Sequence, residues 1–112
     1  MGTLTHGGLV VPRDPVLKSE LTVRPVENGI GIRPPSFKVY RASGDTMVVP
    51  RYYGRTKFGA PATDARGPPA SAPINFSGTL RAETHQLAAF DAGIKAFQET
   101  GGGVLSLAPG FG

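Results

Sequence analysis

The chain has 112 residues, at most the length of one domain, and its 16 Gly and 11 Pro bring it close to the composition at which aperiodic chains rich in these residues tend toward disorder. A hydrophobic share of 39% argues against complete disorder, so we expect a partly ordered chain with long irregular segments. The absence of cysteine excludes disulfides and thiolate metal sites, and no stretch has the roughly 18 apolar residues of a membrane span or the pattern of a secretory signal. We therefore expect an intracellular protein with no membrane partner.

The net charge of +4 is unevenly distributed along the chain. Six basic residues and one acidic residue lie between positions 33 and 57, whereas two basic and three acidic residues lie between position 67 and the last residue. The basic stretch could bind nucleic-acid phosphates and stack bases on its aromatic rings. The candidate residues for these contacts are Arg41, Arg51, Tyr52, Tyr53, Arg55 and Lys57, with Tyr40 and Phe58 also available for stacking. The alternative is that the charges are solvated and the aromatic side chains belong to the core.

The start of the chain predicts a loose arm followed by a β-rich basic accessory segment. Residues 1–19 show no useful hydrophobic period and contain two prolines, which favours the arm. The basic accessory segment covers residues 20–59. It opens with a short alternating strand over 20–26 and continues with a turn region over 27–35.

The middle of the chain predicts a hairpin and then a linker. Alternating residues at 36–42 and 46–50 flank the turn sequence Ser-Gly-Asp, which is typical of a β-hairpin. Residues 51–59 are compatible with a short helical turn or with a loop. Residues 60–73 are rich in Pro, Ala and Gly and poor in bulky side chains, which predicts a linker.

The best periodic signal in the chain lies in its last third. Apolar residues spaced 3, 4 and 3 apart fall on one face of a helix over about 82–99; they are Leu87, Phe90, Ile94 and Phe97. This pattern predicts that both phenylalanines belong to the core. Gly101 supplies a helix stop, and a short apolar strand is expected over 104–107.

The last residues, Leu-Ala-Pro-Gly-Phe-Gly, resemble the first part of a phosphate-binding loop. Such a loop has the form G-x-x-x-x-G-K-[ST], in which backbone amides surround the phosphates, lysine reaches the outer phosphates and Ser/Thr holds magnesium. Gly110 and Gly112 match its last glycines, and Leu107 replaces the usual small residue at its first position. The alternative is an ordinary glycine-rich terminus.

The order of these motifs resembles that of superfamily 2 helicases of large DNA viruses, of the poxvirus transcript-release type and its algal-virus relatives. The quoted stretches are "LTVRP" (21–25), "SFKVYR" (36–41), "VPRYYG" (49–54), "GTLRAETHQLAAF" (78–90) and the final "GGGVLSLAPGFG". In that family a Leu-Arg then Gln element, a helix, a short strand and the phosphate loop open the nucleotide site. The resemblance covers about residues 20–112.

The resemblance implies an α/β fold in which a β-rich accessory segment precedes the first helix and strand of a RecA-like motor domain, here residues 74–112. It implies ATP and Mg²⁺ as cofactors of the intact protein, DNA or RNA as partner, and a virion or a site of viral replication or transcription as location. The implied nucleotide-binding residues are Arg81, Gln86, Pro109, Gly110, Phe111 and Gly112. The lysine, the acidic magnesium motif and the second motor domain are expected in a missing C-terminal part of the same helicase. This chain alone is therefore predicted to be inactive and to hold no catalytic residue.

Two points remain open at the level of the sequence. Four residues separate Arg81 from Gln86, where the family usually has two, so Gln86 either reads adenine through its amide or is a solvent-facing residue of the first helical turns. The two histidines, His6 and His85, have no acid cluster nearby, which argues against a metal site.

The rival interpretation of the whole chain is a small basic nucleic-acid-binding or viral structural module with an incidental glycine-rich tail.

Overall fold

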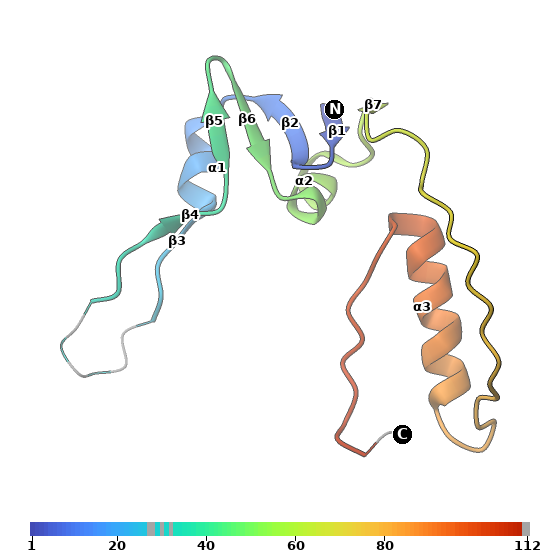
Figure 1. The fold of residues 1–112 in the computed structure, drawn as a ribbon. Helices are drawn as coiled ribbons and strands as arrows, with labels where there is room; N and C mark the ends of the chain where they lie inside the picture. Colours follow the sequence, from blue (N-terminus) through green and yellow to red (C-terminus); the bar gives the residue numbers. More distant parts are fainter. Residues whose placement is uncertain (27–28, 30, 32, 111–112) are drawn as a thin grey trace. The chain divides into compact units, whose positions relative to one another are not determined.

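The computed structural model describes residues 1–26, 29, 31 and 33–110, and the chain divides into two compact units, Met1–Ala70 and Ser71–Gly112 (Figure 1). It is a mixed α/β structure with a five-stranded mixed sheet, a two-stranded sheet and three helices among the described residues. The boundary between the two units lies inside the segment 60–73.

The five-stranded sheet belongs to the first unit and has the order β5-β6-β2-β1-β7. Its strands are β1 (Thr3–Thr5), β2 (Gly8–Pro12), β5 (Arg41–Ser43), β6 (Thr46–Val49) and β7 (Thr63–Asp64). All neighbours pair antiparallel except β1 and β7, which are parallel. A separate antiparallel pair joins β3 (Thr22–Val23) to β4 (Phe37–Lys38). The strand β7 lies within the stretch that its composition suggested was only a linker.

Residues 1–19 are not a loose arm, and that expectation is wrong. They form the β1–β2 hairpin and helix α1 (Pro15–Glu20). The Asp14 side chain caps this helix by accepting a 2.7 Å hydrogen bond from the Val16 amide, and Pro15 supplies a preset φ in the first turn. The two prolines thus end a strand and begin a helix.

Gly8 permits the close approach of β2 to β6. Its φ is +133°, and a Cβ placed on it would lie 2.3 Å from the Val49 carbonyl oxygen. Any other residue would therefore meet the neighbouring backbone. The approach allows Leu9 to pair with Val49 and Val11 with Met47.

Among the residues that the structure describes, the hydrophobic core lies entirely in the first unit. Its buried members come from β1, β2, α1, its C-cap and β6; they are Leu4, Leu9, Val11, Leu17, Leu21, Met47 and Val49. Three partly buried aromatic residues pack against it, namely Tyr40, Tyr53 and Phe58. Tyr53 and Phe58 belong to helix α2 (Arg51–Phe58), so of the two alternatives for that stretch the helical one is confirmed.

The expected 36–42/46–50 hairpin is present in a shorter form. β5 and β6 pair around Gly44, with Arg41 opposite Val48. Phe37 and Lys38 leave this ladder and pair with β3 instead. The strand expected over 20–26 is reduced to Thr22–Val23, because Glu20 ends α1. The expected turn region 27–35 lies partly outside the described residues.

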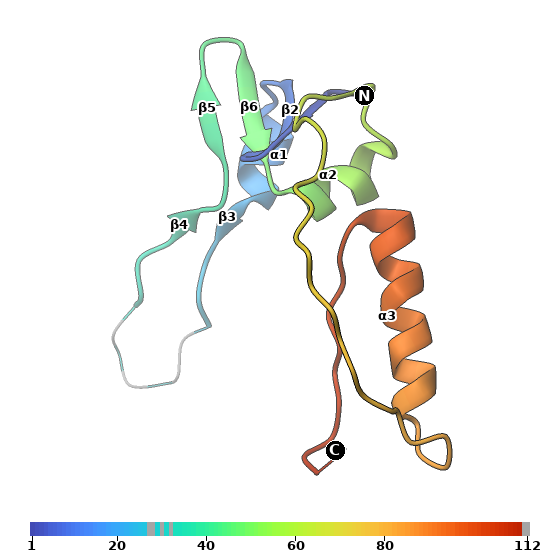
Figure 2. The ribbon, with the colours of Figure 1, turned by 45° about the vertical axis from the view of Figure 1, so that its right-hand side comes forward.

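The second unit contains helix α3 (Gln86–Thr100) flanked by extended segments (Figure 2). The helix confirms the periodicity signal, and it ends at Gly101 in the left-handed conformation. None of its residues is buried, and Phe90 and Phe97 are 51% and 63% exposed, so the expectation that both are core residues is wrong for the described structure.

The strand expected over 104–107 is also absent. Residues 102–108 have no regular structure, and Val104 is 94% exposed. The physical reason is that an isolated strand needs a partner for its backbone groups, and the described part of this unit offers none.

Candidate nucleic-acid and nucleotide sites

Helix α2 packs one of its faces on the hydrophobic core. Gly54 is buried, and a Cβ on it would lie 2.6 Å from Leu9 Cδ2, so this face packs directly on β2. Phe58, one turn later, packs on the same core. Of the residues expected to contact nucleic acid, Tyr53 packs against this core as well.

Tyr53 and Lys57 are one turn apart and both contact Glu20, the last residue of α1. Lys57 Nζ donates to the two carboxylate oxygens of Glu20 at 2.6 and 2.8 Å, and the Tyr53 hydroxyl donates to Oε2. The pKa of Glu20 is lowered from its usual value. The largest cause is the hydrogen bond from Lys57, and the second is the hydrogen bond from Tyr53. The pKa of Tyr53 is raised to about 12, mainly by desolvation and in second place by the hydrogen bond to Glu20. These two side chains join α1 to α2.

Arg51 and Tyr52 form a second pair of a cation and a ring on α2. The Arg51 guanidinium lies 4.7 Å from the centre of the Tyr52 ring and donates a 2.6 Å hydrogen bond to its hydroxyl. Tyr52 is 45% exposed, and Arg55 is exposed as well. An exposed ring beside a guanidinium is a surface on which a base can stack.

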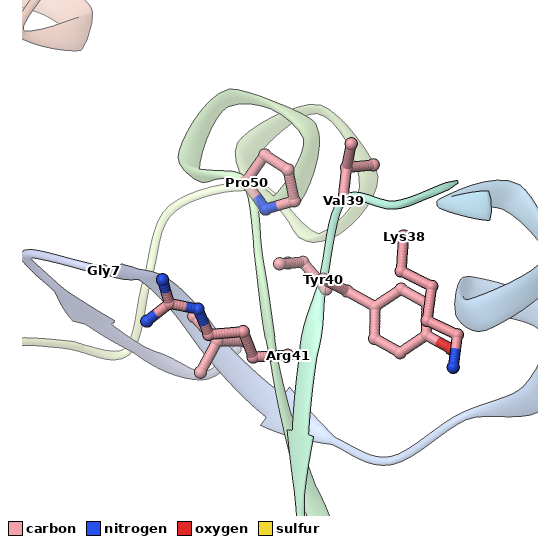
Figure 3. A pocket seen from close by; sticks show the side chains of 8 residues that line it. Gly7, Lys38, Val39, Tyr40, Arg41 and Pro50 are labelled. Atoms are coloured by element: carbon pink, nitrogen blue, oxygen red, sulfur yellow. The ribbon is translucent and has the colours of Figure 1, made fainter. Parts of the chain in front are cut away.

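Arg41 lies away from α2, at the start of β5, where it lines an open groove of about 420 Å³. The other lining residues are Gly7, Lys38, Val39, Tyr40, Val48, Val49 and Pro50. In Figure 3, Arg41 points toward Gly7, while Tyr40 and Lys38 lie together on the opposite side of the strand. Sequence reasoning missed Lys38 as a contributor, although its place within a basic alternating strand was a usable signal.

In the second unit, the structure brings Arg81 and Gln86 together. Gln86 Oε1 accepts a 3.0 Å hydrogen bond from the Arg81 backbone N–H. Thr84 donates to the Arg81 carbonyl oxygen at 3.2 Å and accepts from the Gln86 backbone N–H at 3.4 Å. The four residues between Arg81 and Gln86 thus form a closed turn that orients the glutamine side chain.

The tail after α3 runs back along the helix toward the end that carries Gln86, as both views show (Figures 1 and 2). Pro109 and Gly110 form a turn there, and Gly110 has a φ of +78°. Phe111 and Gly112 lie outside the described residues. Among the described residues there is no group of three or more His, Asp or Glu side chains that could hold a metal ion, and no helix is long and apolar enough to cross a membrane.

Comparison with known proteins gives one informative similarity. The chain is 35% identical over 102 residues to a protein of Acanthamoeba polyphaga mimivirus named "putative ATP-dependent RNA helicase". The aligned region is 86% of this chain and 19% of that protein, so the chain spans about a fifth of the relative's length. No protein-family model and no solved structure matches the chain. The match is therefore distant and partial, and what that protein's name says of its activity belongs to that protein.

Proposed function

We propose that this chain is the N-terminal part of an ATP-dependent nucleic-acid helicase and carries the beginning of its ATP site. The observation that carries the proposal is the 35% identity over 102 residues to the viral protein named as a helicase. In this interpretation the first unit is the accessory domain. The second unit begins the RecA-like motor domain, with α3 as its first helix.

The residues of the second unit suit one part of ATP binding. Gln86 is held by its bond to the Arg81 amide, and an amide side chain offers donors and an acceptor for the edge of adenine. The Pro109–Gly110 turn lies toward the same end of α3 and would begin the loop whose backbone amides surround phosphates. When bound with Mg²⁺, ATP would supply the phosphoryl group whose hydrolysis drives the helicase.

The charge-neutralising part of the site is not supplied by the described residues. They hold no acidic cluster for Mg²⁺. Without lysine and magnesium ligands, the charge that develops on the transferring phosphoryl group has no electrostatic partner. In this proposal, turnover therefore belongs to the intact helicase, and its nucleic-acid substrate would contact the exposed cations and rings of the first unit, including Arg51, Tyr52 and Arg55.

The test is nucleotide specificity in the natural polypeptide that carries these residues. Gln86→Ala is expected to raise KM for ATP by about three- to tenfold, the effect of losing a hydrogen bond of about 1 kcal/mol, while leaving KM for GTP unchanged. Gln98→Ala, an exposed glutamine on the same helix, is the matched control and is expected to behave as wild type. A polypeptide that hydrolyses no nucleotide, with or without RNA or DNA, would contradict the proposed function.

A second candidate function is a small basic nucleic-acid-binding module. One observation favours it: every buried core residue that the structure describes lies in the basic first unit. The coding sequence discriminates between the two, because a Lys-Thr segment encoded after Gly112, directly or beyond an insertion, supports the helicase. Absence of motor motifs from the gene, together with ATP-independent binding, supports the module.

A further inference from the structure

The open groove beside β5 has a surface that nothing in the sheet covers. β5 is the edge strand of the order β5-β6-β2-β1-β7, and the chain enters it through residues 38–40. The groove's volume of about 420 Å³ is within the range of small-ligand sites. Its walls come from the β1–β2 turn at Gly7 and from the end of β6.

The charge of this groove is entirely positive. Its lining includes Lys38 and Arg41 and no acidic residue. Both side chains are exposed, and neither makes an ion pair or hydrogen bond with the residues that the structure describes. By contrast, Lys57 and Arg66 in the same unit are bound to Glu20 and Asp64, and the pKa of Asp64 falls to about 2 through its hydrogen bonds with Arg66. The groove cations therefore remain available for a ligand.

The groove also has an apolar part, to which Val39 and Pro50 contribute. Val39 and Pro50 lie close together in Figure 3. Tyr40 packs against the hydrophobic core, and the Val39 backbone N–H donates to the Leu21 carbonyl oxygen at 2.9 Å. An apolar surface in the same groove as two cations suits a planar base on the apolar part and phosphates on the cations.

We propose that this groove binds a single strand of nucleic acid, with Arg41 and Lys38 on its phosphates and one unstacked base on the Val39/Pro50 surface. The inference rests on the proposed function and names the substrate form that its first unit recognises. A duplex keeps its bases stacked and paired, so only a single strand can place a base in the groove. Because phosphates and a generic base face supply the contacts, sequence preference is weak.

The test is the affinity of the full chain for a fluorescently labelled oligouridylate, measured by anisotropy over a range of salt concentrations without ATP. The double variant Lys38→Gln/Arg41→Gln is expected to reduce the slope of log K against log salt by about 1.4, from about 0.7 per phosphate contact in a single strand. Because of this difference in slope, the ratio of wild-type affinity to variant affinity is expected to be about 25-fold larger at 0.1 M salt than at 1 M salt. The control Lys18→Gln/Lys95→Gln removes the same charge elsewhere and is expected to keep the wild-type slope.

A second pair of variants adds charge instead of removing it. Val39→Asp places a carboxylate in the groove that holds the two cations and is expected to weaken binding, whereas Val26→Asp adds the same charge at a position that is 86% exposed and leaves binding unchanged. Circular dichroism of each variant verifies that the fold is kept. A thiouridine-labelled strand is expected to crosslink within residues 38–41.

Three results would overturn the proposal: no binding by the wild-type chain, wild-type affinity of the double variant, or equal affinity for a duplex. None of these results affects the KM for ATP of Gln86→Ala. A failure of the groove proposal is therefore distinguishable from a failure of the proposed function.

Discussion

At the scale of single residues, the contact between α2 and β2 depends on the absence of a side chain at Gly54. A Cβ there would lie 2.6 Å from Leu9 Cδ2, 3.0 Å from Leu9 Cβ and 3.3 Å from Val49 Cγ2. Alanine would gain about 1 kcal/mol of helix propensity, but overpacking a core typically costs about 1–3 kcal/mol. We expect Gly54→Ala to lower the free energy of unfolding by about 1 kcal/mol, measured by urea denaturation.

The matched control is Gly93→Ala on α3, where a Cβ meets nothing within 4 Å. Here the propensity term acts alone, so helix content is expected to rise by circular dichroism. Equal or greater stability of Gly54→Ala would mean that Leu9 moves aside easily and that this contact does not position α2.

At the scale of elements, Glu20 joins α1 to α2 through Tyr53 and Lys57. The raised pKa of Tyr53 means that its contribution to stability is complete below pH 10.0 and is lost as the pH rises toward about 12. The lowered pKa of Glu20 means that its contribution is present above pH 4.5 and is lost as the pH falls below that value. Ultraviolet titration should therefore show a tyrosine transition at about pH 12 that is absent from Tyr53→Phe.

Glu20→Gln is expected to lower the pKa of Tyr53 only in part, because desolvation, the largest cause of the shift, remains. Glu83→Gln, an exposed carboxylate of the second unit, serves as the control and should leave the titration unchanged. An unchanged Tyr53 transition in Glu20→Gln would show that the two helices are not joined in solution through this carboxylate.

The elements that the sequence predicts well are those that depend on local signals. The spacing of Leu87, Phe90, Ile94 and Phe97 predicts α3 to within a few residues at its start and one at its end. The β1–β2 hairpin is not predicted, because its stability comes from pairing β2 with β6, some 40 residues later, as in Leu9 with Val49. The start of α1 did carry a local signal, since Asp14 followed by Pro15 is a typical N-cap and first turn.

The candidate nucleic-acid residues also depend on contacts that local sequence signals do not predict. Composition identifies the cations and rings of α2 as a group, but it cannot assign them to faces. Tyr53 and Lys57 contact Glu20 at the end of α1, and the core that buries Leu17 and Leu21 also contacts Tyr53. Lys38 was outside the predicted set; its basic alternating strand was a local signal, but its place in the groove also depends on the pairing of β4 with β3.

At the scale of the whole molecule, the two units differ in what can stabilise them. The core from Leu4 to Val49 belongs to Met1–Ala70, whereas α3 in Ser71–Gly112 has no buried residue. Burial of apolar surface is the main favourable term in folding, and isolated helices of about 15 residues are marginal in water. We therefore expect the first unit, and not α3, to be the better protected part of the chain.

Hydrogen exchange of the full chain, followed by mass spectrometry, measures this difference directly. We expect the slowest amides in β2 and β6, around Val11 and Met47, because they exchange only when the first unit unfolds as a whole. Amides of α3 are expected to exchange at least tenfold faster, since a helix with an uncovered apolar face opens without breaking a core. Adding urea below the unfolding midpoint should accelerate β2 and β6 while leaving α3 nearly unchanged, because α3 already opens by a separate local transition. Equal protection of α3 and β2 would contradict this prediction. It would show that Leu87, Phe90 and Ile94 are covered in solution.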